Sequence, residues 1–66
     1  EHYTLKKDDN ELAIYRTQEG TGDAYVYRMI HLRFDSIEAG EQAVLSVGRV
    51  FDSVEDAEVY IASLKP

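Results

Sequence analysis

The tripeptide Phe-Asp-Ser occurs twice in this sequence, at residues 34–36 and 51–53, and an aliphatic residue and a glutamate follow each copy. A serine or aspartate followed by an acidic residue is typical of a helix start, where the side chain accepts a hydrogen bond from a free backbone N–H group. Either both copies begin helices, or the same letters serve two different structures. The answer decides how much of the chain remains for a sheet.

The second copy predicts a helix over residues 53–64. Apolar residues recur behind it at spacings of three, four and three, from Val54 to Leu64, which places them on one helical face. Glu55 and Asp56 put negative charge at the positive end of the helix dipole. The last predicted element of the chain is therefore an amphipathic helix.

The first copy has two interpretations. A helix capped by Ser36 would be amphipathic, whereas a two-residue turn at residues 39–40 would make a hairpin. Gly40 favours the hairpin, because glycine costs about 1 kcal/mol relative to alanine inside a helix and accepts turn geometry without strain. The β-branched run at residues 44–51 also favours a strand, so we expect a strand over residues 42–51.

Two further strands are predicted at residues 11–17 and 24–35, separated by a loop with two glycines. The second of them alternates between inward and outward residues, with one exception. Its inward set is aliphatic and aromatic: Val26, Ile30, Leu32 and Phe34. Its outward set is Tyr25, Tyr27, Met29, His31 and Arg33. Arg28 interrupts the inward set, which predicts a β-bulge or the edge of the sheet at this position.

Together these elements predict one small α+β domain spanning residues 1–66. Its three- to four-stranded antiparallel sheet, a meander, is packed on one face by a single C-terminal helix. The expected core consists of Leu12, Ile14, Val26, Ile30, Leu32, Phe34, Leu45, Val47, Phe51, Val54, Ala57, Ile61 and Leu64.

Composition indicates the class of this protein and its expected cellular location. The chain has 44% hydrophobic and 30% charged residues, which is typical of a globular protein. The absence of cysteine excludes disulfides and thiolate metal sites, and it favours an intracellular, cytoplasmic location over a secreted scaffold. No apolar stretch approaches the ~20 residues of a membrane-spanning helix, so no membrane association is expected.

Residues suited to catalysis are sparse. The only histidines are His2 and His31, and no cysteine is present, which leaves nucleophilic catalysis without a base beside a nucleophile. The acidic runs at residues 8–11 and 52–58 lack the alternating spacing of a calcium loop. The glycines at residues 20–22 lack the lysine of a phosphate loop. We expect no enzymatic activity, no cofactor and no bound metal.

The outward set, Tyr25, Tyr27, Met29, His31 and Arg33, is the candidate binding surface. Tyrosine, methionine and arginine are enriched at protein interfaces, and a sheet covered by one helix leaves its other face open. The sequence therefore predicts a small interaction or regulatory module that binds a protein partner or self-associates as a homodimer.

The alternative is a nucleic-acid mimic. The net charge is −6, and residues 34–66 hold seven acidic residues against two basic ones. Such a surface argues against direct nucleic-acid binding but could occupy the groove of a protein that binds nucleic acid. Its acidic residues would be Asp35, Glu38, Glu41, Asp52, Glu55, Asp56 and Glu58.

Overall fold

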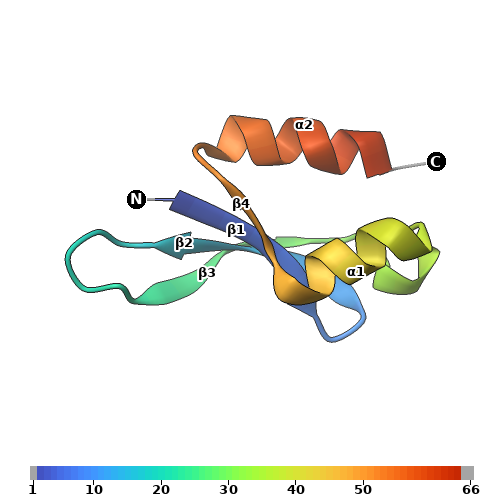
Figure 1. Ribbon diagram of the computed structural model, residues 1–66, viewed down its shortest axis with the longest axis horizontal. Helices are drawn as coiled ribbons and strands as arrows, with labels where there is room; N and C mark the ends of the chain where they lie inside the picture. Colours follow the sequence, from blue (N-terminus) through green and yellow to red (C-terminus); the bar gives the residue numbers. More distant parts are fainter. Residues whose placement is uncertain (1, 65–66) are drawn as a thin grey trace.

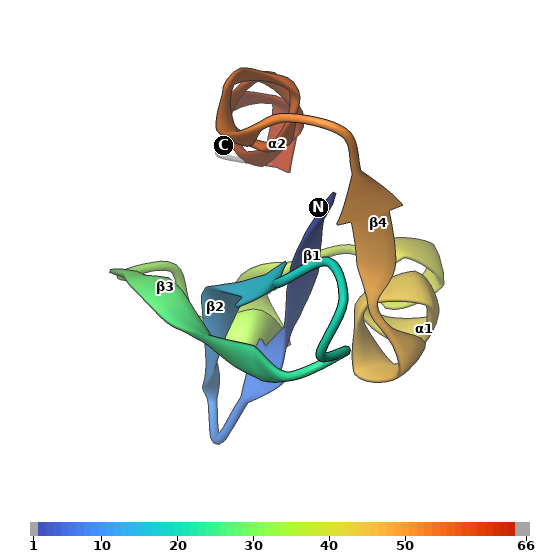
Figure 2. The same cartoon turned by 90° about the vertical axis from the view of Figure 1, so that its left-hand side faces the viewer.

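A computed structural model describes residues 2–64 (Figure 1). The elements, in chain order, are β1 (His2–Asp8), β2 (Glu11–Thr17), β3 (Ala24–Ile30), a 3-10 turn η1 (Phe34–Ser36), α1 (Ala39–Val47), β4 (Arg49–Phe51) and α2 (Val54–Leu64). The strands form one antiparallel sheet, and α2 lies over one of its faces (Figures 1 and 2). The predicted α+β class, with a C-terminal helix on an antiparallel sheet, is confirmed.

The strand order is β3-β2-β1-β4, so β1 and β2 are central while β3 and β4 form the edges (Figure 2). A tight turn at Asp9, with φ 55°, joins β1 to β2. The loop containing Gly20 and Gly22 joins β2 to β3. A continuous meander would have placed the last strand beside β3, but β4 pairs with β1 instead.

The two faces of the sheet differ in what covers them. Leu5 pairs with Ile14, and both side chains are fully buried. Tyr3, on the same side of β1, pairs with Phe51, whose ring centroid lies 5.6 Å from that of Tyr60 on α2. We call this side the helix face. The opposite side, to which the alternate residues of each strand belong, is the open face.

The core lies between the helix face, α2 and the buried side of α1. Its buried members are Leu5, Leu12, Ile14, Phe34, Ile37, Leu45, Ala57 and Ile61. Two predicted core residues are wrong, since Val26 is 46% and Val47 82% exposed. Leu5 and Ile37 were not predicted as core residues. Most residues of β1 around Leu5 are polar, and Ile37 was assigned to the predicted hairpin.

The predicted hairpin and the strand over residues 42–51 are wrong. Residues 39–47 form α1, and only Arg49–Phe51 is strand. Gly40 falls in the first turn of α1, where the backbone N–H groups have no intrahelical partners and a glycine weakens the helix least. Leu45 is fully buried as part of α1, and this packing outweighs the β propensity of its neighbours.

The two Phe-Asp-Ser copies indeed serve different structures. The first forms the turn η1, in which Phe34 is buried and the Ser36 hydroxyl donates to the carbonyl of Arg33 at 2.7 Å. The second precedes α2, where the Ser53 hydroxyl accepts a hydrogen bond from the backbone N–H of Asp56 at 3.2 Å. The predicted helix over residues 53–64 is confirmed as Val54–Leu64.

Tyr60 ties α2 to its neighbours. The guanidinium of Arg49, on β4, lies 4.4 Å from the centroid of the Tyr60 ring, a geometry that favours the cation. The phenol oxygen is buried and makes no hydrogen bond of ordinary geometry within residues 2–64. Burial raises the pKa of Tyr60, the nearby Glu41 carboxylate raises it further, and Arg49 opposes both.

Tyr60 should make the stability of the fold sensitive to alkali. Its pKa is higher in the folded protein than in the unfolded chain, so the neutral phenol is favoured by folding. This contribution is complete below about pH 10, the unfolded value, and it is lost as the pH rises through the folded pKa. We expect the urea midpoint to fall more steeply above pH 10 in the native chain than in Tyr60→Phe, and equal slopes would contradict the assignment.

Candidate interaction surface on strand β3

The strand predicted to bind a partner, β3, is an edge strand with a bulge. Arg28 lies opposite Ile14, but the next pair along β2 is Tyr15 with Val26, so Tyr27 is an extra residue. An extra residue reverses the alternation of side chains beyond it. The sequence-based expectation of a bulge or an edge at Arg28 is therefore met on both counts.

The bulge divides the predicted outward set between the two faces. Tyr25 lies on the helix face, where its hydroxyl accepts a hydrogen bond from Arg16 Nη1 at 3.2 Å. Tyr27 lies there too, with its ring edge-to-face against Tyr3 at 5.5 Å between centroids. Met29 lies on the open face, opposite Ala13. The five residues do not share one face.

His31 and Arg33 lie beyond the strand, which ends at Ile30 rather than at residue 35. His31 Nδ1 is 3.5 Å from a Glu11 carboxylate oxygen. Arg33 Nη2 donates to Asp35 at 3.1 Å. The strand ends here because the backbone N–H of Phe34 donates to the carbonyl of Asn10, which turns the chain toward η1.

What distinguishes β3 is exposure on both faces. Every side chain from Ala24 to Met29 is exposed, including the large apolar groups of Tyr25 (42%), Val26 (46%), Tyr27 (42%) and Met29 (38%). Within residues 2–64, no strand pairs with its outer edge. Its free backbone groups are thus a template for another strand.

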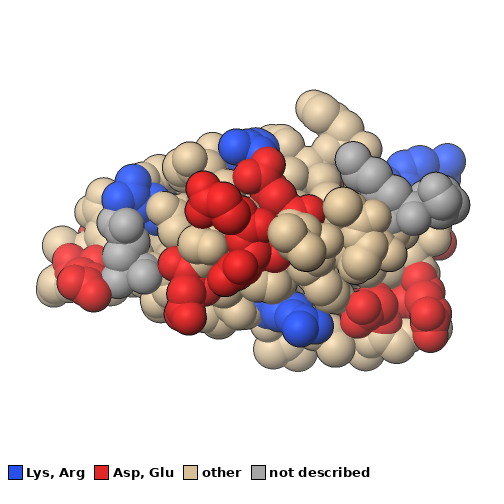
Figure 3. All heavy atoms as spheres, turned by 90° about the horizontal axis from the view of Figure 1, so that it is seen from above, with Lys and Arg blue, Asp and Glu red and all other residues tan. Residues whose placement is uncertain are grey.

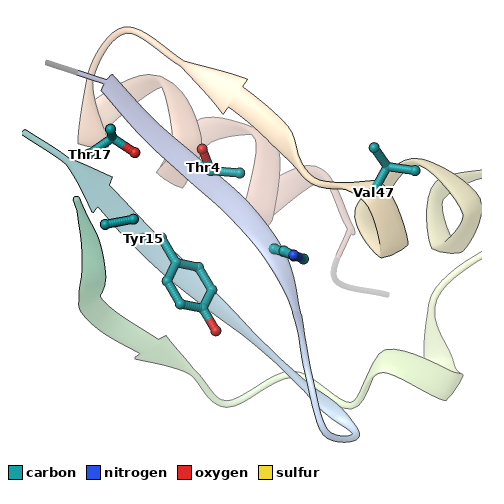
Figure 4. Close-up of a pocket in the computed structure, with 6 residues that line it drawn as sticks. Thr4, Tyr15, Thr17 and Val47 are labelled. Carbon is teal, nitrogen blue, oxygen red and sulfur yellow. The ribbon is translucent and has the colours of Figure 1, made fainter. Parts of the chain in front are cut away.

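The open face also holds a shallow hollow that the sequence did not indicate (Figure 4). Its volume is about 370 Å³, and its lining comes from β1, β2, β3 and α1: Thr4, Lys6, Tyr15, Thr17, Ala24 and Val47. Figure 4 shows Thr4, Tyr15 and Thr17 on this side of neighbouring strands, with Val47 at the end of α1. Thr4 and Lys6 belong to β1 (His2–Asp8), a strand that was not among those predicted.

Charged groups connect β3 to α2. Arg28 Nη1 lies 3.0 Å from a carboxylate oxygen of Glu58, and both side chains are about half exposed. An ion pair this accessible contributes about 0–1 kcal/mol. A second hollow, of about 340 Å³, lies between the end of β3 and α2, next to this pair and His31.

The acidic residues of the alternative hypothesis are spread over several elements. Figure 3, which looks down on the α2 side, shows acidic side chains gathered across the middle of that view and a second group at its lower right. Glu58 and Asp35 are neutralised by Arg28 and Arg33, and Glu41 is half-buried near Tyr60. The remaining exposed members of the predicted set are Glu38, Asp52, Glu55 and Asp56.

Two observations concern other classes of site. Among the described residues, no three His, Cys, Asp or Glu side chains lie close enough to hold a metal ion. No helix in residues 2–64 is long and apolar enough to cross a membrane.

No protein-family model matches this chain, and comparisons with curated proteins and with solved structures gave no match either. Its surface therefore has to be interpreted from geometry. Within residues 2–64, fold and surface together define a small α+β domain with one sheet face covered by a helix, the other face open, and a long exposed edge strand, β3.

Proposed function

We propose that this chain is a non-catalytic interaction module that binds a protein partner along β3. The observation that carries the proposal is the exposure of β3 on both faces and along its outer edge. Exposed edge strands in natural proteins are usually short, charged, interrupted by proline or covered. This one has seven residues, a single charged side chain and no proline.

The side chains of β3 suit such a role. Tyr25 and Tyr27 offer large aromatic contact surfaces with polar tips, and Met29 is flexible enough to adapt to a partner. Strand addition would satisfy the free backbone groups of β3 and place partner side chains on both faces. His31 and Arg33 would lie where a strand longer than β3 continues past Ile30.

A photo-crosslinking amino acid tests this proposal in the cell that makes the protein. Placed at Val26 on β3, it should capture a discrete protein, whereas the same group at Val59, which is 72% exposed on α2, should not. Adding Tyr25→Ala to the Val26 variant should lower the yield about tenfold or more, because aromatic residues carry much of the binding energy at interfaces.

The acidic mimic is a second candidate, supported by the acidic groups that Figure 3 shows on the α2 side. The same experiment separates the two. A mimic would contact its target through α2, so the Val59 position would capture a protein and the Val26 position would not. Its capture would also weaken steeply as salt is raised. No capture at Val26 would contradict binding along β3.

A further inference from the structure

We infer that the partner of β3 is a second copy of this chain, paired with it antiparallel about a two-fold axis that passes between Tyr27 and Arg28. This inference rests on the proposed function, since it names the occupant of the same strand. Its basis is the order in which β3 presents side chains to the two faces of the sheet.

The bulge fixes where a two-fold axis can pass, because a regularly alternating strand is symmetric about each of its residues, whereas the order from Tyr25 to Ile30 is symmetric only about the midpoint between Tyr27 and Arg28. Among the residues from Tyr25 to Ile30, Val26 and Met29 lie on the open face and the other four lie on the helix face. Contacts with Arg16 and Tyr3 place Tyr25 and Tyr27 on the helix face, and the ion pair with Glu58 does the same for Arg28. The sequence of faces reads identically in both directions from the midpoint between Tyr27 and Arg28.

A two-fold antiparallel pair requires this property. Residues whose numbers add to 55 would face each other, and each such pair shares a face. On the open face, Val26 meets Met29 of the second copy. On the helix face, Tyr25 meets Ile30 and Tyr27 meets Arg28 of the second copy, and a tyrosine beside an arginine is a favourable contact. An unbulged strand paired at this register would set opposite faces against each other.

Charge near the axis does not oppose the pairing, although the chain carries −6. Residues 24–34 contain Arg28 and Arg33 and no acidic residue. Each copy brings Arg28 together with its own Glu58, 3.0 Å away, so two positive and two negative groups surround the axis. In the proposed pair, Glu58 of each copy would also lie near Arg28 of the other copy, so the charges of the two copies are complementary.

The size of the contact sets its strength. A standard interface buries roughly 800 Å² per partner, which is about a fifth of the 4238 Å² surface of this molecule. One seven-residue strand buries less than that. The dimer should therefore be weak and concentration-dependent, with a dissociation constant on the order of micromolar or above.

Sedimentation or light scattering over a concentration series tests the pairing. The mass should rise from 7.5 kDa toward twice that value as concentration increases. Val26→Lys should weaken association about tenfold or more, since a lysine on an edge strand blocks pairing. Val59→Lys, the same change on α2, should leave it unchanged. A native chain that stays monomeric near its solubility limit, or association that Val26→Lys does not affect, overturns the inference.

Cysteine substitutions test the register independently of mass. The chain has no native cysteine, so Val26→Cys and Met29→Cys can be mixed in equal amounts while reduced and then oxidised together. The heterodimer should make up clearly more than the half of all disulfide-linked dimers that random pairing of two thiols gives, because only residues 26 and 29 face each other across the axis. A heterodimer at or below that random share would rule out this register.

The crosslinking experiment at Val26 separates this inference from the proposed function. Capture of a second copy supports both. Capture of a different protein, with a monomeric native chain, keeps the proposed function and overturns the homodimer. Capture of nothing contradicts both.

Discussion

Replacing Leu45 by alanine is expected to lower the free energy of unfolding by about 2–5 kcal/mol, the range measured for large-to-small changes in protein cores. Leu45 is fully buried, and its helix α1 contacts β1. A single core in a chain this small supplies roughly 3–5 kcal/mol in total. The variant should therefore be largely unfolded at moderate temperature, as measured by urea denaturation followed by circular dichroism.

Val47→Ala is the matched control. It removes apolar atoms from the same helix two residues later, where the side chain is 82% exposed. Exposed substitutions of this kind usually change stability by about 0.5 kcal/mol or less. If Leu45→Ala and Val47→Ala have equal effects, α1 does not pack against the sheet as described.

Gly48→Ala is expected to be the second most damaging change. Gly48 ends α1 with φ 113°, in a region that residues with a Cβ rarely adopt, and a Cβ there would lie 2.9 Å from Thr4 Cγ2. The backbone strain alone costs about 1–3 kcal/mol, and the contact with Thr4 adds to it. The loss should appear in the urea midpoint and in the thermal midpoint alike.

Gly40→Ala, in the same helix, is expected to have the opposite effect and to stabilise the protein. Gly40 has an ordinary helical backbone, and an added Cβ would meet only a Glu38 oxygen at 3.9 Å. Alanine there should stabilise the protein by about 0.5–1 kcal/mol, through higher helix propensity and a less flexible unfolded chain. A stabilising Gly48→Ala or a strongly destabilising Gly40→Ala would contradict the helix boundaries.

Local patterns in the sequence were sufficient for β2, the start of β3 and α2. Each has a clear period and a clear boundary, such as the Ser53 cap of α2. They were insufficient for α1, because Gly40 and the valines around Leu45 favour a strand locally while burial of Leu45 favours a helix. That burial depends on packing against β1, which lies far away in the sequence.

The candidate surface was predicted in part. Tyr25, Tyr27 and Met29 are exposed, as expected. Their division between two faces depends on the bulge at Tyr27, and the only local sign of it was Arg28 within an apolar alternation. The hollow on the open face depends on the register of β1 with β2 and on the position of Val47, neither of which a linear pattern contains.

The position of β1 in the centre of the sheet has a consequence for how the molecule forms. β1 meets β2 across a two-residue turn, but its other neighbour contains Phe51, which pairs with Tyr3 from 48 positions away. Closing a long loop costs more entropy than closing a hairpin, so the last strand joins late. Until then the molecule is a three-stranded sheet in which both edge strands, β1 and β3, are unpaired on their outer sides. Once β4 has paired with β1, the long unpaired edge of the sheet is that of β3.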